Sequence, residues 1–255
     1  MEKIEKKRHR FGLVGRNISY SFSKGYFSKK FEALGLVDHS YENFDLPEIG
    51  AINTLLAQNP DIAGFNVTIP YKEAILPYLT DIDAMAKKIG AVNTVKLQGD
   101  RLIGYNTDAY GFQKSLEPFL EAHHQKALIL GTGGASKAIA FVLDRLRIAY
   151  KFVSRRPLKN QLGYGDLTQK TLQEYLILIN CTPLGTHPNV HEKPDIPYDF
   201  ITARHLLFDL IYNPEKTTFL VHGELKGASI CNGHRMLELQ AEKSWEIWTT
   251  EPKTK

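Results

Sequence analysis

The chain has 255 residues, of which 43% are hydrophobic and 24% are charged, and its formal net charge is +4. This composition excludes a disordered chain, and the length suits one large domain or two modest ones. Because lysine and arginine are dispersed after residue 10, we expect no nucleic-acid partner. No apolar run approaches a membrane span, and the charged N-terminus lacks an apolar signal core. We therefore expect a cytoplasmic protein without a membrane partner.

Strand and helix patterns alternate along the first hundred residues. This alternation predicts an α/β fold with a mostly parallel sheet. Ser21 and Ser23 stand in a polar loop, residues 16–23. In an extended segment their hydroxyls would face one way and, with nearby backbone N–H groups, could hold a carboxylate. From spacing alone we favour helix capping by Ser23. We expect strands at 11–15, 39–44, 61–65, 91–97 and 101–105, with helices at 24–34, 47–57 and 81–89.

Three predicted strands end in polar residues, in the segments 64–72, 90–94 and 104–108. Three such ends in one region predict the rim of a parallel sheet, where open α/β folds bind ligands. In the first of them a strand runs into a predicted helix, with Lys72 in its first turn. A cation is unfavourable at that end of a helix dipole. A solvated surface lysine is the alternative to a functional one.

A glycine-rich turn follows the apolar strand predicted at residues 126–130, and a helix is predicted at 135–147. A glycine-rich turn between a strand and a helix is typical of a dinucleotide phosphate site. The third glycine of the usual spacing is replaced by Ser136. The next predicted strand, 150–154, ends in Ser154, Arg155 and Arg156, where an NAD site would have a carboxylate. Two guanidiniums favour the 2′-phosphate of NADP, and two exposed loop arginines are the alternative.

The remaining pattern predicts helices at 108–120, 217–225 and 234–250 and strands at 175–180, 205–210 and 228–232. We expect Trp245 and Trp248 to pack in the core rather than stack on a ligand. His187 and His191 have a proline between them and no cysteine or acidic cluster beside them. We therefore predict no metal site.

Together these stretches resemble the shikimate dehydrogenase family from about residue 11 to residue 248. The resemblance implies a two-domain α/β fold. Residues 1–107 with 234–255 would form an N-terminal α/β substrate-binding domain, to which the C-terminal helix returns. Residues 108–233 would form a Rossmann-type NADP-binding domain. The implied reaction is the reversible NADPH-dependent reduction of 3-dehydroshikimate to shikimate in aromatic amino-acid biosynthesis.

The resemblance also implies residue roles. Lys72 and Asp108 would flank the oxygen that changes between ketone and alcohol. Our hypothesis is that Lys72 donates the proton, while Asp108 positions the substrate and keeps Lys72 charged. The implied substrate-binding residues are Ser21, Ser23, Asn66, Thr68, Asn93, Tyr212 and Gln240. The implied cofactor-binding residues are Gly131, Thr132, Gly133, Gly134, Ala135, Ser154, Arg155, Arg156, Thr182, Leu210 and Gly233.

The chain departs from the family at three places. Lys24 replaces the usual proline after the second serine, Ser154 stands in the family's Asn-Arg-Thr segment, and His234 with Arg235 replaces smaller residues. The alternatives are a dehydrogenase for quinate or another polyhydroxy carboxylic acid, and a non-catalytic dinucleotide sensor. Methylene-tetrahydrofolate dehydrogenase shares the domain plan but does not explain the serine pair. The implied partner is a small-molecule substrate, with the protein a monomer or homodimer.

Overall fold

The computed structural model describes residues 9–18 and 21–251; most of the charged N-terminal stretch, and Ser19 and Tyr20 of the polar loop, lie outside them. The chain divides into two compact units. Unit 1 comprises Met1–Thr107 with Ala241–Lys255, and unit 2 comprises Asp108–Gln240. The second division falls within helix α8 (His234–Thr249), whereas the sequence predicted a crossing before that helix.

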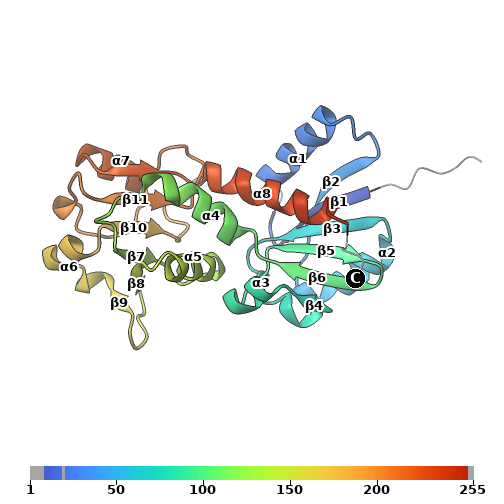
Figure 1. The fold of residues 1–255 in the computed structure, drawn as a ribbon, viewed down its shortest axis with the longest axis horizontal. Helices are drawn as coiled ribbons and strands as arrows, with labels where there is room; N and C mark the ends of the chain where they lie inside the picture. Colours follow the sequence, from blue (N-terminus) through green and yellow to red (C-terminus); the bar gives the residue numbers. More distant parts are fainter. Residues whose placement is uncertain (1–8, 19–20, 252–255) are drawn as a thin grey trace, which may run out of the picture. The chain divides into compact units, whose positions relative to one another are not determined.

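Unit 1 is built on a six-stranded sheet of order β2-β1-β3-β5-β6-β4 (Figure 1). Strands β1, β2 and β3 are parallel, as are β4 and β6, whereas β5 runs antiparallel to β3 and β6. Strands β5 and β6 are antiparallel because a tight turn joins them, with Gly99 at φ +60°. The strands are β1 (His9–Gly15), β2 (His39–Asp45), β3 (Ile62–Val67), β4 (Asp81–Ile82), β5 (Thr94–Gln98) and β6 (Arg101–Tyr105).

Two hydrophobic clusters cover the two faces of this sheet. Along β1, Phe11 belongs to one cluster and Val14 to the other, as the alternation of a strand requires. Helix α1 (Phe22–Ala33) and the last turns of α8 pack on the Phe11 side. Both Trp245 and Trp248 lie in that cluster, so the packing prediction is confirmed. Helix α2 (Ile52–Gln58) packs with the other cluster, and α3 (Ala84–Ile89) contributes Ala86 to it.

Several helix predictions in unit 1 were wrong in detail. Helix α1 begins at Phe22 with Ser21 as its cap, so the predicted start at residue 24 and capping by Ser23 were wrong. No α-helix begins near Lys72, because Pro77 lacks the N–H needed to continue one. Only turns and a short 3₁₀ helix, Leu76–Tyr78, follow β3. The predicted helix 81–89 is β4 followed by α3, and a 3₁₀ turn precedes α2 in the predicted helix 47–57.

Unit 2 contains a second six-stranded sheet whose strand pairs are all parallel. Its order, β12-β11-β10-β7-β8-β9, has two halves running outward from β7 and β10. This is the order of dinucleotide-binding sheets, which bind ligands where the halves diverge. The strands are β7 (Lys126–Leu130), β8 (Ala149–Ser154), β9 (Leu162–Gly163), β10 (Ile177–Asn180), β11 (Leu206–Asp209) and β12 (Ser229–Cys231).

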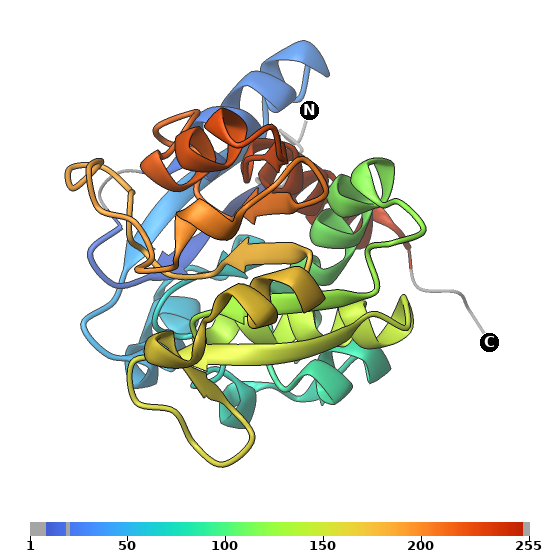
Figure 2. The ribbon, with the colours of Figure 1, turned by 90° about the vertical axis from the view of Figure 1, so that its left-hand side faces the viewer.

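Unit 2 also contains helices α4 (Asp108–Leu116), α5 (Gly134–Arg145), α6 (Gln169–Glu174) and α7 (Thr218–Leu225), together with the start of α8. Strand β9 and helix α6 were not predicted, because each is too short for a periodic pattern. Figure 2 shows the β8–β9 connection, residues 155–161, as a long loop standing off the sheet. Among the residues that the structure describes, no helix has the length and apolar character needed to cross a membrane.

Candidate active site

The three polar strand ends predicted in unit 1 do meet at one edge of its sheet. Strands β3 and β6 end at this edge, but β5 is antiparallel and begins there, so the prediction of a parallel rim was wrong for residues 90–94. The backbone of Asn93, just before β5, joins both neighbours. Its carbonyl accepts from Val67 N at 2.8 Å, and its N–H donates to Tyr105 O at 3.1 Å. The edge therefore gathers polar side chains from three separate stretches of sequence.

The Asn93 side chain lies buried at this edge, in contact with Thr107. Its Oδ1 accepts from the backbone N–H of Thr107 at 2.7 Å, and its Nδ2 donates to Thr107 Oγ1 at 3.0 Å. Asn66, at the end of β3, is also buried and donates through Nδ2 to the carbonyl of Asn93 at 3.2 Å. Both amides are therefore held in fixed orientations by neighbouring groups.

Thr68 and Lys72 follow β3 in the turn segment. Thr68 N donates to Val14 O at 2.9 Å, which holds the segment beside the end of β1. Lys72 is partly buried, and its carbonyl accepts from Val92 N at 2.8 Å. Lys72 thus lies beside the loop that carries Asn93. Asp108 is buried at the start of α4 in unit 2, so its meeting with Lys72 stays a prediction.

Ser21 and Ser23 stand at the N-terminus of α1. Ser21 Oγ accepts from Lys24 N at 3.4 Å, a bond that the family's usual proline has no N–H to make. Ser23, two residues further along the chain, is buried. The bond to Lys24 leaves the hydroxyl proton of Ser21 to be donated elsewhere.

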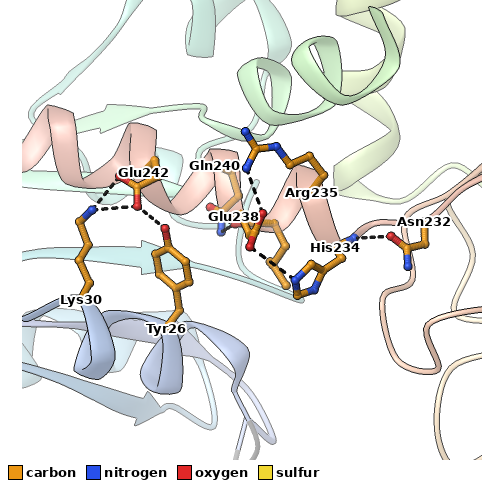
Figure 3. Close-up of polar contacts among 9 residues, drawn as sticks. Tyr26, Lys30, Asn232, His234, Arg235, Glu238, Gln240 and Glu242 are labelled. Atoms are coloured by element: carbon orange, nitrogen blue, oxygen red, sulfur yellow. Dashed lines mark hydrogen bonds and ion pairs between the residues drawn. The ribbon is translucent and has the colours of Figure 1, made fainter. Parts of the chain in front are cut away.

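An ion pair joins α1 to the part of α8 that belongs to unit 1. Figure 3 shows Glu242 of α8 facing Tyr26 and Lys30 of α1. Lys30 Nζ lies 2.7 Å from a Glu242 carboxylate oxygen, and Tyr26 donates its hydroxyl to the same carboxylate. These contacts, with the aromatic packing below them, fix the helix that carries Ser21 and Ser23.

The glycine loop of unit 2 has the geometry of a phosphate cradle. Gly131 follows β7 at φ +104°, and a Cβ there would lie 3.1 Å from Thr182 Cγ2. Gly133 caps α5 without a side-chain hydrogen bond, and a Cβ at Gly133 would meet nothing within 4 Å. The N-terminus of a 12-residue helix therefore faces open space, as a pyrophosphate requires. The residues present fit a dinucleotide.

Ser136 takes the place of the third glycine without disturbing the loop. Its side chain is buried and donates to Gly133 O at 2.6 Å. Thr132 lies between the glycines, and Ala135 is the second residue of α5. The third glycine normally permits close packing of helix and strand. Ser136 is accommodated at this position because its hydroxyl is hydrogen-bonded to the loop backbone.

Ser154 ends β8, next to β7 in the sheet, and its Oγ accepts from Arg156 N at 3.2 Å. Arg155 and Arg156 follow it, exposed, at the start of the loop 155–161. The end of this strand carries no carboxylate among its described residues up to 161. Two exposed guanidiniums at this place suit a 2′-phosphate.

A buried carboxyl that the sequence analysis missed lies where β10 and β11 end. Asp209 Oδ1 accepts from Ile211 N at 3.0 Å and from Asn180 Nδ2 at 3.1 Å, and Oδ2 accepts from Thr217 Oγ1 at 2.6 Å. Asn180 Oδ1 in turn accepts from Thr182 N at 3.0 Å. Burial raises the pKa of Asp209 to about 6, against the opposing effect of these hydrogen bonds. In the sequence, the signal that could have identified Asp209 is a carboxylate at the end of an apolar strand.

Gly233 lies against the end of β11. Its N–H donates to Ile211 O at 3.0 Å, and a Cβ there would overlap the carbonyl of Leu210. Tyr212 is partly buried in the segment after β11, and Gln240 is buried with Nε2 donating to Leu237 O at 3.1 Å. Unit 2 thus brings the ends of β11 and β12 together.

The substituted pair His234 and Arg235 turns outward from the first turn of α8. Figure 3 shows both side chains directed at Glu238, at 3.5 Å from His234 and 3.1 Å from Arg235. Met236 remains buried beside them. The two larger residues therefore do not displace the packing of Met236.

Comparisons with known proteins agree with this geometry. Residues 13–95 match the family model of the shikimate dehydrogenase substrate binding domain. A shikimate dehydrogenase (NADP(+)) of Methanococcus maripaludis is 38% identical over 96% of this chain and 93% of its own. The crystal structure of a Thermus thermophilus shikimate 5-dehydrogenase in complex with NADP(H) and shikimate is 31% identical. It has a TM-score of 0.83 and covers 94% of this chain and 93% of that one.

A protein of different activity shares the fold. The ligand-free 5-ketofructose reductase of a Gluconobacter strain is 27% identical, with a TM-score of 0.77 over 95% of this chain and 93% of its own. The fold therefore does not by itself decide the substrate.

Proposed function

We propose that this chain, which belongs to the shikimate dehydrogenase family, catalyses the reversible NADPH-dependent reduction of 3-dehydroshikimate to shikimate. The observation that carries the proposal is the polar sheet edge of unit 1, where Lys72 follows β3 beside the loop that carries Asn93. Fixed amides beside a lysine suit a small polyhydroxy acid. The glycine loop and arginine pair of unit 2 support NADP as the cofactor.

The proposed roles of the substrate residues follow their chemistry. Ser21 and Ser23 donate to the substrate carboxylate at the N-terminus of α1, where the helix dipole favours an anion. Thr68, Asn93 and Gln240 hold the ring hydroxyls, and Asn66 and Tyr212 lie nearby. We assign residues 1–107 and 234–255 to the substrate domain and residues 108–233 to the cofactor domain.

The proposed cofactor residues cradle the pyrophosphate and read the 2′-phosphate. Backbone groups of residues 131–135 accommodate the pyrophosphate, and Ser154, Arg155 and Arg156 bind the 2′-phosphate. Thr182, Leu210 and Gly233, at the ends of β10, β11 and β12, line the rest of the site. When bound, NADPH supplies the hydride.

Lys72 is the proposed proton donor to the substrate oxygen on which negative charge develops. The lysine ammonium carries three protons, any of which can be donated to that oxygen. The carboxylate of Asp108 positions the substrate and favours the charged lysine. In the reverse direction Lys72 accepts the proton of the alcohol.

The substrate assignment is tested by comparing turnover of shikimate and quinate with NADP and with NAD. We expect the highest kcat/KM with shikimate and NADP. Preference for quinate would favour the related polyhydroxy-acid dehydrogenase. NADPH binding without turnover of either acid would favour the non-catalytic sensor. We propose that the protein acts in the cytoplasm as a monomer or homodimer, without nucleic acid.

A further inference from the structure

Unit 2 contains a cavity of about 640 Å³, a volume within the range of small-molecule sites. It is lined by α4, the 3₁₀ turn after it, the start of α7 with the segment before it, β12 and the start of α8. Because every lining residue lies between Tyr110 and Leu239, the cavity belongs to unit 2 alone. Of the described residues that we propose to bind cofactor or substrate, none lines it. We call it the α4–α8 cavity.

Apolar side chains from five elements line the α4–α8 cavity. They are Tyr110 on α4, Phe119 in the 3₁₀ turn, Leu220 on α7, Ile230 on β12 and Leu239 on α8. The two aromatic rings are among the exposed large apolar side chains of the chain, at 37% for Tyr110 and 36% for Phe119. A ligand that covers these rings removes apolar surface from water, and an aromatic ligand can also stack on them. The cavity therefore suits a ligand with a large apolar body.

Three cations also line the cavity, and each forms an ion pair with a glutamate outside the lining. The pairs are Lys114 with Glu117 at 3.0 Å, Lys216 with Glu224 at 2.8 Å and Arg235 with Glu238 at 3.1 Å. Figure 3 shows the last of these pairs. An ammonium has three N–H donors and a guanidinium has five, so each cation keeps donors beyond its glutamate. Those donors can hold the carboxylate of a ligand.

Glu215 supplies the opposite charge. It is an exposed carboxylate of the lining, and within the described part of the chain it forms no ion pair. Its backbone carbonyl accepts from Asn232 Nδ2 at 2.8 Å, which holds the segment before α7 beside the end of β12. A carboxylate without a cationic partner attracts an ammonium group. The α4–α8 cavity thus offers sites for both a positive and a negative group.

We infer that the α4–α8 cavity binds an α-amino acid with a large apolar side chain. The ammonium of the amino acid pairs with Glu215, and its carboxylate takes the remaining donors of the three cations. Its side chain covers Tyr110 and Phe119. A ligand with one charge leaves one of these two charged groups unused. The inference does not depend on the proposed function, because it uses none of the residues assigned to the reaction.

The test is calorimetric titration of the full chain with L-phenylalanine, with and without saturating shikimate and NADP. Three fragments identify the groups that are recognised: 3-phenylpropanoate lacks the ammonium, 2-phenylethylamine lacks the carboxylate and L-alanine lacks the ring. We expect L-phenylalanine to bind in both conditions and each fragment to bind at least about fivefold more weakly.

Two variants assign the charges. Glu215→Gln should weaken binding of L-phenylalanine about fivefold without weakening that of 3-phenylpropanoate, which has no ammonium to lose. Arg235→Gln should weaken both of these ligands but not 2-phenylethylamine, which has no carboxylate. The matched control is Lys226→Gln, which removes a cation paired with Asp199 at 3.0 Å outside the cavity. It should leave the affinity for L-phenylalanine unchanged.

Three results would overturn the inference. The first is a wild type that does not bind L-phenylalanine, or that binds all three fragments equally well. The second is binding that disappears when shikimate and NADP are added, since the amino acid would then occupy their sites. The third is an equal loss of affinity in Lys226→Gln, because the charges of the cavity would then have no specific part in binding.

Discussion

Arg155 and Arg156 are exposed at the end of β8, and their proposed role is selection of NADP over NAD. We predict that replacing both by alanine lowers kcat/KM with NADP about 30-fold to 100-fold, because charge-assisted bonds to the 2′-phosphate are lost. The value with NAD should change less than about threefold. Steady-state kinetics with both cofactors measure this.

The control for the arginine pair is Lys159→Ala, which removes an exposed cation from the same loop. It should leave the preference for NADP unchanged. An equal loss with NAD and NADP in the arginine variant would show that these residues do not read the 2′-phosphate.

Asp209 makes the stability of the fold depend on pH. Burial raises its pKa from an ordinary 3.8 to about 6, so the folded protein binds its proton more tightly than the unfolded chain does. The contribution of this group to the free energy of unfolding is therefore full below pH 4 and is lost as pH rises through 6. The loss amounts to up to about 3 kcal/mol.

We predict that Asp209→Asn removes this dependence. The amide keeps an acceptor for Ile211 N and Asn180 Nδ2 and donates to Thr217 Oγ1. Urea unfolding of both proteins at pH 4.5 and pH 7 measures the effect. The variant should gain stability relative to the wild type as pH rises. A difference that stays constant would mean that Asp209 does not titrate in this range.

In the glycine loop, a substitution can affect cofactor binding without affecting the stability of the fold. We predict that Gly133→Ala changes the free energy of unfolding by less than about 1 kcal/mol, since a Cβ there meets nothing within 4 Å. The same change should raise the KM for NADP about tenfold or more, because the methyl group takes the space of the pyrophosphate. Denaturant unfolding and steady-state kinetics measure the two effects.

Gly131→Ala is the matched variant. Gly131 has φ +104° and lies against Thr182, so alanine is strained whether or not a cofactor binds. It should lower stability and cofactor binding together. If Gly133→Ala left the KM for NADP unchanged, the loop would not be the cofactor cradle.

The elements of unit 2 were the most predictable from sequence. Buried central strands such as β7 and β10 are apolar runs bounded by glycine or polar residues, and amphipathic helices such as α5 carry a clear period. Strand β9 has only two residues, too few for a pattern. The order of the strands became clear only from the register of their pairing.

Less of unit 1 and of the candidate site was predictable. The strand ends that carry Asn66, Asn93 and Thr107 were identified from their polar breaks. The turn at Lys72 resembled a helix because Pro70 suits a first turn, although Pro77 prevents its continuation. Asp209 gave only the signal of a carboxylate at the end of an apolar strand, and a single polar residue in that place shows neither its burial nor its partners.

The tryptophans of the chain report on one of its two units. Both tryptophans, Trp245 and Trp248, belong to unit 1. We predict that shikimate at about 100 times its dissociation constant raises the free energy of unfolding reported by tryptophan fluorescence by about 2.7 kcal/mol. An inert polyol at the same concentration is the control. No shift with shikimate would contradict the assignment of unit 1 as the substrate domain.

The whole account depends on Lys72 as the proton donor in an enzyme that reduces 3-dehydroshikimate. The most direct measurement follows NADPH consumption with 3-dehydroshikimate by the wild type, Lys72→Ala and the control Lys88→Ala, an exposed lysine on α3. We predict an active wild type, an unchanged control, and a chemical step slowed about 10²-fold to 10⁴-fold in Lys72→Ala. A slowing of less than about tenfold, or a wild type that leaves NADPH unconsumed, would contradict the account.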